Sequence, residues 1–446
     1  MITRIEIHGF KSFHHFAADL RPFQVLIGPN GVGKTNLFDA IVLLSNLAGD
    51  HTLDDAFGHS RGELNELFTV YLDGKSASLM TFAVEMLIGR TVADETGRAR
   101  PLSTTRLRYE LDIERRVEDG VEHVYVMREG LLPIAEANDK WAKDMIPARD
   151  RKNWILREKR PPFIATAAEK EQMVIYRNQD APGGGREAIS VDRIDRTVLS
   201  TANALRYPTI HAVQQEMLNW RFLQLNPFAL RSHSGPQDPG SLLPDGSNLV
   251  AVLGRLSREN ETALPGILRD MVKIIPDLRD LTVKPIAGRD DSLIEVQMQD
   301  GSRFSSRVIS DGTLRLLSLV TLKNDPGHRG TLCFEEPENG VQPTRLKQIV
   351  DVLYALSTNF ATQSSESSPL RQVLINTHSP GLLASVPADS LFYVGMKMDE
   401  QGRATRIIPV RPVLIADDQD QFYTWEQVKQ YLDTDPLARK REELGL

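Results

Sequence analysis

The stretch GPNGVGKT, residues 28–35, decides the fold. It fits the pattern G-x-x-x-x-G-K-[ST], whose glycines let consecutive backbone N–H groups face a phosphate chain. The apolar run FQVLI (23–27) precedes it and indicates a buried strand. A stretch with Leu37, Ile41 and Leu44 on one side follows and indicates an amphipathic helix. Strand, glycine-rich loop and helix in this order predict a phosphate-binding loop in an α/β fold.

The side chains of this loop have separate predicted roles. Lys34 is expected to reach the β- and γ-phosphates of a nucleotide, and the Thr35 hydroxyl to coordinate Mg²⁺. The positive N-terminal end of the following helix adds to the attraction for phosphate. An ordinary glycine-rich turn is the alternative, and the flanking strand and helix argue against it. The candidate nucleotide-binding residues of the loop are Gly28, Asn30, Gly31, Gly33, Lys34, Thr35 and Asn36.

A second stretch, TLCFEEPENG (331–340), carries two adjacent acids at the end of an apolar run. A buried strand that ends in two carboxylates can hold a metal ion and polarise a water molecule. We expect Glu335 to hold Mg²⁺, mostly through water, and Glu336 to polarise the attacking water. Taken alone, the pair could equally be a solvated strand end. Downstream of a phosphate-binding loop, the catalytic interpretation is favoured.

Two further stretches have weaker signals. LINTHSP (374–380) is an apolar strand with a polar tip, where His378 could hydrogen-bond a γ-phosphate or the attacking water. A lone histidine at a strand end is more often structural, but its place one strand after the acids favours a role. In SDGTLRLLSL (310–319), Ser310 and Gly312 stand at a helix start, which is an anion site of the same physical kind as the phosphate loop. Ser-Asp-Gly-Thr is also a plain turn and helix cap.

With these motifs in this order, the sequence resembles the ABC-type ATPase heads of the RecF/SMC/OLD class, within a bacterial branch of predicted ATPases. The resemblance extends from residue 5 to about residue 385 and is weak from about 95 to 240. It implies a P-loop NTPase of the ABC head type, α/β in class, with a mixed-sheet core, an antiparallel β lobe and a helical insert. The motifs that carry it are IEIHGFKSF, GPNGVGKTN, SDGTLR, EEPENG and THSP.

The resemblance also implies an assembly. In such heads two protomers sandwich two ATP molecules, so that Ser310 and Gly312 would act in trans on the γ-phosphate held by the partner. Asn339 and Gly340 fall where the D-loop of the class crosses the dimer interface. A homodimer or higher oligomer with composite ATP sites is therefore expected.

The resemblance also implies that the metal ligands are Thr35, Glu335 and Gln224. Gln224 would be the glutamine that links the metal to the helical lobe. Glu335 replaces the usual aspartate, but a metal contact through water absorbs the extra methylene, so the Glu-Glu pair does not argue against hydrolysis. Gln342 stands where relatives often carry histidine. Lys11 is placed near the nucleotide base by analogy.

The organisation of the chain is expected to follow three segments. Residues 1–190 form a first ATPase lobe with antiparallel strands and an irregular insert, whose part 137–188 has no legible pattern. Residues 191–275 form a helical subdomain. Residues 276–446 form a second lobe with signature, acid strand and switch histidine, ending in a small helix near 424–432.

The composition of the chain and the features that it lacks reduce the number of possible functions. The 446 residues carry a net charge of −7, which argues against wholesale coating by nucleic acid, and the single Cys333 lies in an apolar run. No apolar run is long enough for a membrane span, and the N-terminus lacks the apolar core of a signal peptide, so a cytoplasmic protein without membrane contact is expected. Between the phosphate loop and the signature we find no long heptads, which argues against coiled-coil arms and favours a compact insert.

Other classes fit less well. About 60 residues follow the THSP motif, too few for a TOPRIM nuclease domain, so no nuclease is expected in this chain, and DDQD (417–420) is interpreted as a solvated acidic turn rather than a metal site. A transporter subunit would have a signature closer to LSGGQ. A GTPase would have N-K-x-D, whereas LKND (322–325) has the wrong order.

The favoured function is an ATPase that dimerises around ATP and controls a separate effector, such as a toxic nuclease, in bacterial anti-phage defence. The alternative is a RecF-like ATPase of DNA repair or chromosome maintenance that binds DNA directly, with the basic run 149–160 as the place for contacts. The alternative interpretation of residues 149–160 is a solvated surface segment. A third class, a nucleotide-gated scaffold with little turnover, would look the same in sequence.

Overall fold

The computed structural model describes residues 1–169, 172–180, 185–234, 240–288, 291–364, 368–399, 402–411 and 423–424. The helix expected near 424–432 and the acidic turn 417–420 lie outside these residues. The contacts within the chain divide it into two compact units. The first contains Met1–Trp220, Thr358–Gln372 and Ala388–Leu446, and the second contains Arg221–Ser357 and Val373–Pro387. The three segments expected from the sequence stay a prediction, because units defined by contacts need not coincide with them.

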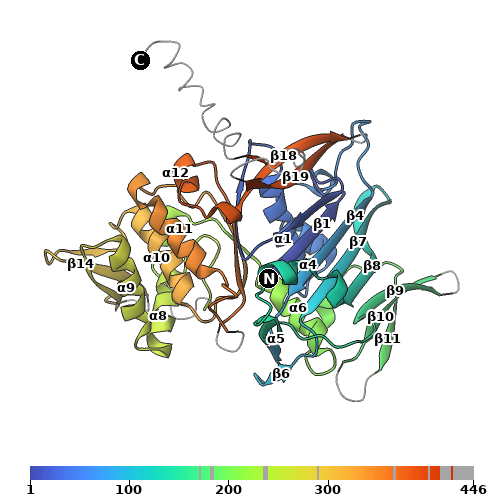
Figure 1. The fold of residues 1–446 in the computed structure, drawn as a ribbon, viewed down its shortest axis with the longest axis horizontal. Coiled ribbons are helices and arrows are strands. Elements are labelled where there is room, and N and C mark those ends of the chain that lie inside the picture. Colours follow the sequence, from blue (N-terminus) through green and yellow to red (C-terminus); the bar gives the residue numbers. More distant parts are fainter. Residues whose placement is uncertain are drawn as a thin grey trace, which may run out of the picture. The chain divides into compact units, whose positions relative to one another are not determined.

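An eight-stranded sheet dominates the first unit (Figure 1). Its neighbouring strands pair antiparallel, which confirms the antiparallel lobe. In one of its strands Leu107, Tyr109, Leu111 and Ile113 alternate with charged residues and are at most 1% exposed, so one face of the sheet is buried. In spatial order the strands are β11 (Arg186–Ser190), β10 (Gln172–Asn178), β9 (Ile164–Glu169), β8 (Val121–Pro133), β7 (Arg106–Glu118), β4 (Leu79–Leu87), β1 (Ile2–His8) and β2 (Phe16–Asp19).

A mixed set of strands carries the phosphate-binding loop in the same unit. Strand β3 (Phe23–Ile27) is buried along its whole length and pairs parallel with β18 (Leu391–Asp399). Strand β18 pairs antiparallel with β19 (Gly402–Arg411), and β19 pairs parallel with β20 (Tyr423–Thr424). Helix α1 (Lys34–Leu47) follows the loop. The predicted mixed sheet is therefore present, with the loop at the end of a fully buried strand.

Short elements make up the rest of the first unit. The segment 137–188, which has no legible sequence pattern, contains two short helices and the hairpins β9–β11. Its elements are too short for a hydrophobic period to emerge. The remaining elements of the unit are α2 (Leu53–Gly58), α3 (Leu64–Leu67), β5 (Thr91–Ala93), β6 (Ala99–Pro101), η1 (Glu136–Asn138), α4 (Lys140–Met145), α5 (Arg151–Trp154), η2 (Leu199–Thr201), α6 (Pro208–Leu218) and η4 (Ala388–Ser390).

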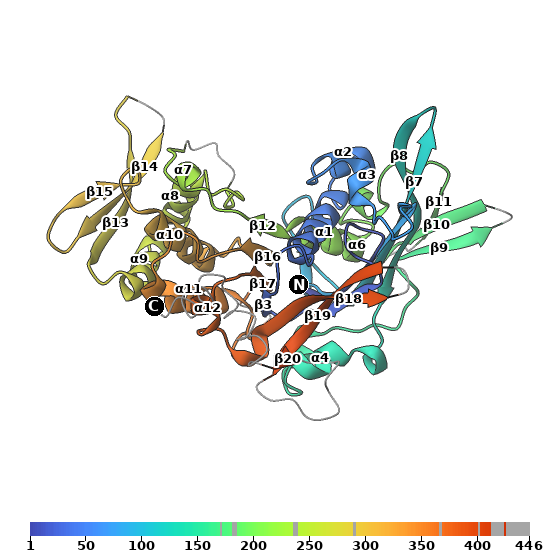
Figure 2. The ribbon, with the colours of Figure 1, turned by 90° about the horizontal axis from the view of Figure 1, so that it is seen from above.

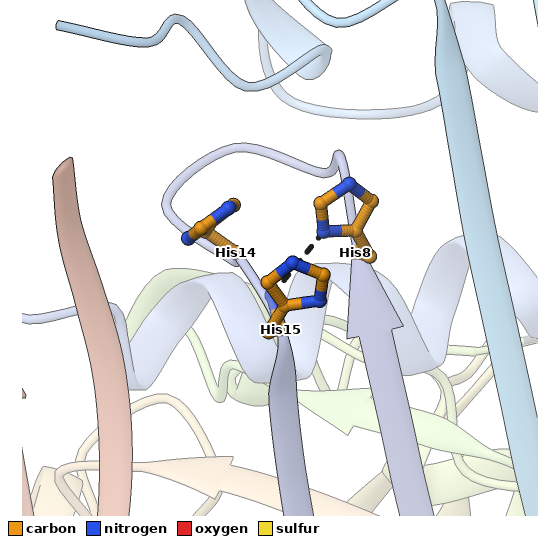
Figure 3. Close-up of side chains that lie close together, drawn as sticks. All are labelled: His8, His14 and His15. Atoms are coloured by element: carbon orange, nitrogen blue, oxygen red, sulfur yellow. Dashed lines mark hydrogen bonds between the residues drawn. The ribbon is translucent and has the colours of Figure 1, made fainter. Parts of the chain in front are cut away.

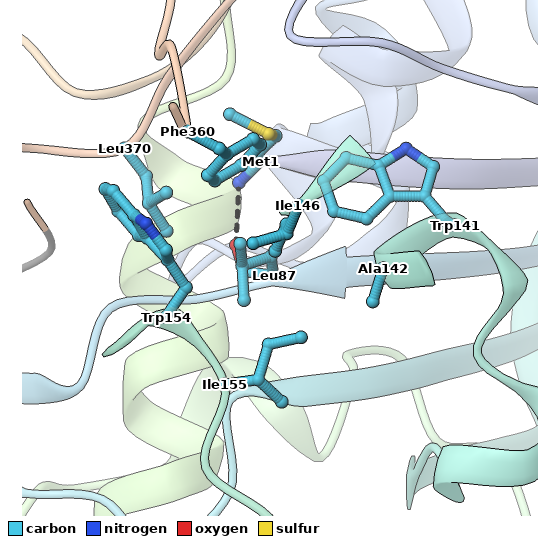
Figure 4. Close-up of a cluster of buried hydrophobic side chains, with 9 residues drawn as sticks. All are labelled: Met1, Leu87, Trp141, Ala142, Ile146, Trp154, Ile155, Phe360 and Leu370. Atoms are coloured by element: carbon cyan, nitrogen blue, oxygen red, sulfur yellow. Dashed lines mark hydrogen bonds between the residues drawn. The ribbon is translucent and has the colours of Figure 1, made fainter. Parts of the chain in front are cut away.

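One apolar cluster shows why residues 358–372 belong to the first unit (Figure 4). The ring of Phe360 lies edge-on to Trp141 and Trp154, with centroid distances of 5.8 and 5.1 Å. Such edge-to-face pairs add about 0.5–1.5 kcal/mol each beyond the burial of their area. Residues 358–372 are thus held to the first unit by side chains that lie about 200 residues earlier in the sequence. The cluster consists of Met1, Leu87, Trp141, Ala142, Ile146, Trp154, Ile155, Phe360 and Leu370.

The second unit combines three strands with helices and a small separate sheet. Strand β16 (Gly330–Glu335) lies between β12 (Arg221–Leu223) and β17 (Arg371–Asn376), whose first two residues belong to the first unit. Cys333 is fully buried in β16, as its apolar surroundings predict. The sequence also predicts the strands at 331–334 and 373–376 and the helix at 313–322, all of which are present.

The helices of this unit are α7 (Pro227–Leu230), α8 (Leu249–Glu259), α9 (Ala263–Ile274), α10 (Asp311–Asn324), η3 (Pro343–Arg345), α11 (Leu346–Leu356) and α12 (Pro380–Leu383). Figure 2 shows α8 and α9 beside a three-stranded antiparallel sheet. That sheet consists of β13 (Leu278–Pro285), β14 (Ser292–Met298) and β15 (Arg303–Ser305). Across the described parts of both units, no helix has the length and apolar character that crossing a membrane requires.

Candidate functional site

The phosphate-binding loop follows β3 in a conformation that requires glycine at its first position. Gly28 has φ 150°, and a Cβ atom there would lie 2.1 Å from the carbonyl oxygen of Val394 on β18. No side chain fits such a gap, so the loop can leave β3 in this direction only with glycine. At Gly31, in contrast, a Cβ would meet nothing within 4 Å. The loop is therefore packed on one side and open on the other, as a cradle for a phosphate chain must be.

Two hydroxyl-bearing side chains hold the loop from outside. Thr405 on β19 is 1% exposed and donates from Oγ1 to the carbonyl oxygen of Val32 at 2.9 Å. Asn36 at the start of α1 donates from Nδ2 to Oγ of Ser12 at 2.8 Å. The Ser12 and Thr405 hydroxyl oxygens are themselves 3.2 Å apart. These bonds fix the loop and the first turn of α1 without any ligand.

Lys34 is folded against its own loop. Its ammonium nitrogen lies 2.6 Å from the carbonyl oxygens of both Gly28 and Pro29, and the residue is only 5% exposed. A cation held beside a row of loop N–H groups and the N-terminus of α1 suits an anionic phosphate chain. Thr35 and Asn36 are half-buried at the same helix start, and Asn30 is exposed. The loop residues are thus gathered in one place, and their roles toward a nucleotide stay a prediction.

The two acids stand at the end of β16, and the second has an unusual backbone. Glu336 has φ 46°, a left-handed conformation that few residues other than glycine adopt. Its N–H donates to the carbonyl oxygen of Asn376 at 2.8 Å, and Asn339 donates from Nδ2 to its Oε2 at 2.6 Å. Such a conformation costs about 1–3 kcal/mol and persists where surrounding contacts impose it. The turn therefore places the Glu336 carboxylate in a defined position.

Gln224 and Glu335 stand at the ends of neighbouring strands in the second unit. Strands β12 and β16 pair parallel with Leu223 opposite Phe334; Gln224 follows the end of β12 and is exposed, and Glu335 is the last residue of β16. Asn376 donates from Nδ2 to Oε1 of Glu335 at 3.3 Å. Carboxylate and amide oxygens are ligands that Mg²⁺ accepts. The donor set fits the ion, and the assignment of these residues as ligands stays a prediction.

Two residues near the acids escaped the sequence analysis. Oε2 of Glu338 and Oδ1 of Asn376 are buried and have no hydrogen-bond partner among the described residues. Buried oxygens without partners are rare in native proteins and mark places where a water, ion or ligand is to be expected. The sequence signals were a third acid in EEPE and a polar residue at the end of an apolar strand. Neither signal tells whether the side-chain oxygen has a hydrogen-bond partner in the folded protein.

Glu338 also connects the two strand tips. Thr377, which follows β17, donates from its hydroxyl to Oε1 of Glu338 at 2.5 Å. Burial, opposed by this hydrogen bond and assisted by the charge of Glu336, raises the pKa of Glu338. His378, the next residue, is half-buried, and its role toward a γ-phosphate or a water stays a prediction.

The signature residues cap α10 and pack against the turn that follows the acids. Oγ of Ser310 accepts a hydrogen bond from the N–H of Thr313 at 3.3 Å, which is the helix cap that the sequence allowed. A Cβ on Gly312 would lie 2.7 Å from the carbonyl oxygen of Gly340. Only glycine permits this close approach. Gly312 is therefore buried against the turn at Gly340, while Ser310 and Gly340 are exposed.

Lys11 has an acidic partner. Its ammonium nitrogen lies 2.7 Å from Oδ2 of Asp39 on α1, and Arg61 approaches Oδ1 of the same carboxylate at 3.2 Å. The turn that carries Lys11 is thus tied to the helix behind the phosphate loop. Its expected place near a nucleotide base stays a prediction.

The basic run 149–160 is largely engaged in internal contacts. Arg151 donates to the carbonyl oxygens of Ile146 and Lys143, at 3.0 and 2.8 Å. Arg157 forms an ion pair with the buried Asp139, and Arg160 lies over the ring of Phe163 at 4.1 Å from its centroid. Three of the arginines therefore help to hold the fold, which reduces the charge that the run can offer to DNA.

Two family models match the chain. Residues 1–110 match a model described as an AAA ATPase domain. Residues 185–384 match a model described as an AAA domain, putative AbiEii toxin, type IV toxin–antitoxin system. Together the two stretches contain the phosphate loop, the signature, both acids and His378.

Curated relatives match over part of their length. The DNA replication and repair protein RecF of Acidothermus cellulolyticus is 28% identical over 200 residues, which cover 43% of this chain and 47% of that protein. Structural maintenance of chromosomes protein 1 of Schizosaccharomyces pombe is 38% identical over 52 residues, or 11% of this chain and 4% of that protein. The chain thus spans about half the length of the RecF that it matches.

Solved structures of SMC heads are similar at low identity. The SMC head bound to the C-terminal winged-helix domain of ScpA has a TM-score of 0.44 and 14% identity, covering 92% of this chain and 97% of that one. The SMC head domain from Thermotoga maritima has a TM-score of 0.39 and 12% identity, covering 92% and 99%. At such scores the similarity carries no conclusion about partners or activity.

Proposed function

We propose that this chain, which belongs to the ABC-type ATPases of the RecF/SMC class, binds ATP with Mg²⁺ and hydrolyses it, with Glu336 polarising the attacking water. One observation carries the proposal. The residue expected to act on water is held in a strained left-handed conformation and is bonded to Asn376 and Asn339. Strain of this kind collects at functional sites, where the position of one side chain matters more than its cost.

Each residue has a part in the proposed reaction. The loop N–H groups and the Lys34 ammonium bind the phosphates, and Lys34 donates to phosphate oxygens as charge develops on them. Glu336 accepts a hydrogen bond from the water and takes up its proton, while Asn339 keeps the carboxylate oriented. His378 donates to the γ-phosphate or to the water. Thr35, Glu335 and Gln224 would hold Mg²⁺, which neutralises phosphate charge when bound.

The proposed assembly is a dimer in which each ATP contacts the loop of one protomer and the signature of the other. The packing of Gly312 against Gly340 beside the exposed Ser310 supports it, because a helix N-terminus and an adjoining turn can face a partner's γ-phosphate together. A higher oligomer built on the same contact would form the same composite ATP sites.

A mixing experiment tests this arrangement. Lys34→Ala and Ser310→Arg should each abolish turnover alone. In a heterodimer of the two, one site combines an intact loop with an intact signature, so a one-to-one mixture should recover up to about a quarter of wild-type activity. Hydrolysis within a single protomer would give no recovery.

The proposed role is control of a separate effector, such as a nuclease, in anti-phage defence inside the cell. The match to a model described as a putative AbiEii toxin of a type IV toxin–antitoxin system supports this role. Expression of the chain together with its neighbouring genes should lower the plating efficiency of phage, and Glu336→Gln should remove the protection. Protection that survives in Glu336→Gln would separate the defence role from hydrolysis and favour a nucleotide-gated scaffold.

A second candidate is a RecF-like function in repair or chromosome maintenance with direct DNA binding, which the 28% identity to RecF supports. Phosphate contacts predict that log K falls linearly with log salt concentration, with a slope near −0.9 per contact. Because Arg151, Arg157 and Arg160 are engaged internally, Lys152→Glu and Lys159→Glu should change that slope little if DNA binds elsewhere. A clear loss in these two variants would assign the run to DNA.

A further inference from the structure

Three histidine rings meet at the start of the chain, apart from the residues discussed above (Figure 3). The rings of His8 and His15 are stacked with centroids 4.4 Å apart, and the ring of His14 lies 5.3 and 4.5 Å from them. One nitrogen of each ring lies within 4.8 Å of the corresponding atoms of the other two. Among the described residues, this is the one group of three or more histidine, cysteine or acidic side chains with such spacing.

The backbone around the rings is fixed by its own contacts. Strands β1 and β2 pair with Ile7 opposite Phe16, so His8 and His15 are the next residues across the ladder. The turn between them is closed by the N–H of Gly9, which donates to the carbonyl oxygen of Phe13 at 3.0 Å. His15 has φ 48°. The three rings are thus brought together by the fold and not by flexible side chains alone.

The group is buried on one side and open on the other. His14 is 4% exposed, His8 is half-buried and His15 is exposed. His8 and His15 line a groove of about 430 Å³ on the face of the eight-stranded sheet, whose other walls include Glu6 and Arg108. An ion therefore has a path to the rings, and a water molecule has room to complete its coordination.

We propose that His8, His14 and His15 bind one divalent transition-metal ion, with Zn²⁺ as the ion that their chemistry suits best. Neutral imidazole nitrogen is a preferred ligand of Zn²⁺, and three protein ligands with an open fourth position are a common arrangement for it. No thiolate takes part, and the rings carry no negative charge that would favour Mg²⁺ or Ca²⁺.

Binding requires the stacked rings of His8 and His15 to rotate, because the lone pair of an imidazole nitrogen lies in the plane of its ring. Zn–N bonds are about 2.0–2.1 Å long, so ligand nitrogens of one ion lie closer together than 4.8 Å. Nδ1 of His8 now accepts a hydrogen bond from the N–H of His15 at 3.3 Å, and its Nε2 is 3.5 Å from the Tyr71 hydroxyl. Both contacts are long for hydrogen bonds. At His8 the ion therefore displaces weak interactions, and with all three rings it forms three coordinate bonds.

The ion would connect β1 to β2 across the turn 9–13, which carries Ser12. Because Ser12 accepts a hydrogen bond from Asn36 at the start of α1, a metal at the three histidines would stiffen a contact of the phosphate-binding loop. The proposal does not depend on hydrolysis, since metal binding is measured directly.

The test uses the full chain without a histidine tag, stripped of metal by chelator. Zn²⁺ is titrated in competition with a chromophoric chelator, and Co²⁺ serves as a spectroscopic probe of the coordination geometry. We expect one Zn²⁺ per chain and, with Co²⁺, the visible absorption bands of a four-coordinate ion. His15→Asn should weaken binding at least about tenfold, because one of three ligands is lost.

Asn is chosen at position 15 because it tolerates a positive φ, which keeps the turn intact. His59→Asn is the matched control, since His59 faces His51 at 6.3 Å in a second, two-membered histidine contact outside the group. At a fixed Zn²⁺ concentration, the melting temperature should rise equally in the wild type and in His59→Asn, and clearly less in His15→Asn. No stoichiometric binding by the wild type, or equal affinity in His15→Asn, would overturn the proposal and leave the rings as a stacked cluster.

Discussion

The phosphate-binding loop of the first unit and the acid turn of the second differ in how completely their polar groups are satisfied. In the loop, Lys34 bonds to two carbonyl oxygens and Thr405 bonds to a third. In the acid turn, Glu336 is strained, and Glu338 and Asn376 each keep a buried oxygen without a partner among the described residues. The side chains that hold the loop have partners before a ligand arrives, whereas the acid turn keeps two buried side-chain oxygens that are open to a water, an ion or a ligand.

This difference predicts different consequences for mutation. An unsatisfied buried polar group costs about 1–3 kcal/mol, and so does a strained backbone position. The acid turn therefore lowers the free energy of unfolding of the protein. Changes in the loop should therefore weaken both nucleotide binding and the fold. Changes in the acid turn should weaken turnover alone.

Lys34→Ala should have the largest combined effect on nucleotide binding and on stability. Loss of the ammonium group removes the cation from the phosphates and should lower kcat/KM for ATP by about two to three orders of magnitude. It also leaves the carbonyl oxygens of Gly28 and Pro29 without their donor, so the melting temperature should fall as well. Steady-state hydrolysis and a thermal melt measure the two effects, with the exposed Lys75→Ala as control. A variant that binds ATP normally would remove Lys34 from the site.

A smaller effect is expected from Thr405→Val, which keeps the shape of the side chain and deletes its hydroxyl. The buried carbonyl oxygen of Val32 then lacks its donor, at a cost of about 1–3 kcal/mol in the free energy of unfolding, and KM for ATP should rise several-fold. Urea unfolding and kinetics check both expectations. Thr405→Ser retains the hydroxyl and should behave like the wild type. If the serine variant is as impaired as the valine variant, packing and not the hydrogen bond holds the loop.

The smallest effect concerns Glu338→Gln and depends on pH. Burial raises the pKa of Glu338 in the folded protein above its unfolded value. An acid with a raised pKa disfavours the folded state when it ionises, so wild-type stability should fall as pH rises from the unfolded pKa, near 4.5, through the higher folded pKa. Glutamine does not titrate. Its advantage in the free energy of unfolding should therefore grow through this window and stay constant above it.

Urea unfolding of both proteins at several pH values measures this advantage. Glu261→Gln, which removes an exposed carboxylate from the same unit, should show no such trend. An advantage of Glu338→Gln that does not change with pH would mean that this carboxylate is not destabilised by burial.

The sequence predicted the parts of the fold that local pattern encodes. The loop 28–35, the acid strand and the strand before His378 each combine an apolar run with a distinctive end, and all are present as expected. The segment 137–188 was illegible because its helices and strands are short. The return of residues 358–372 to the first unit depends on contacts of Phe360 that are remote in sequence.

Prediction of the site has a similar limit. Gln224 was named by analogy, and only the register of β12 with β16 shows that the strand before it neighbours the strand of Glu335. The roles of Glu338 and Asn376 could not be predicted, because an orphaned oxygen is defined by what surrounds it in space. The three histidines are close in sequence, but a six-residue separation says nothing about whether the chain turns back between them.

The most direct test of the account compares ATP hydrolysis and ATP binding by the purified wild type and Glu336→Gln. The substitution keeps the size of the side chain and removes its capacity to take up a proton, so kcat should fall by about two to four orders of magnitude. ATP affinity should stay within about twofold of the wild type, because the side chains that hold the phosphate-binding loop have their partners without the acid turn. Equal turnover in the two proteins, or loss of ATP binding in the variant, would contradict the division of labour between the two regions.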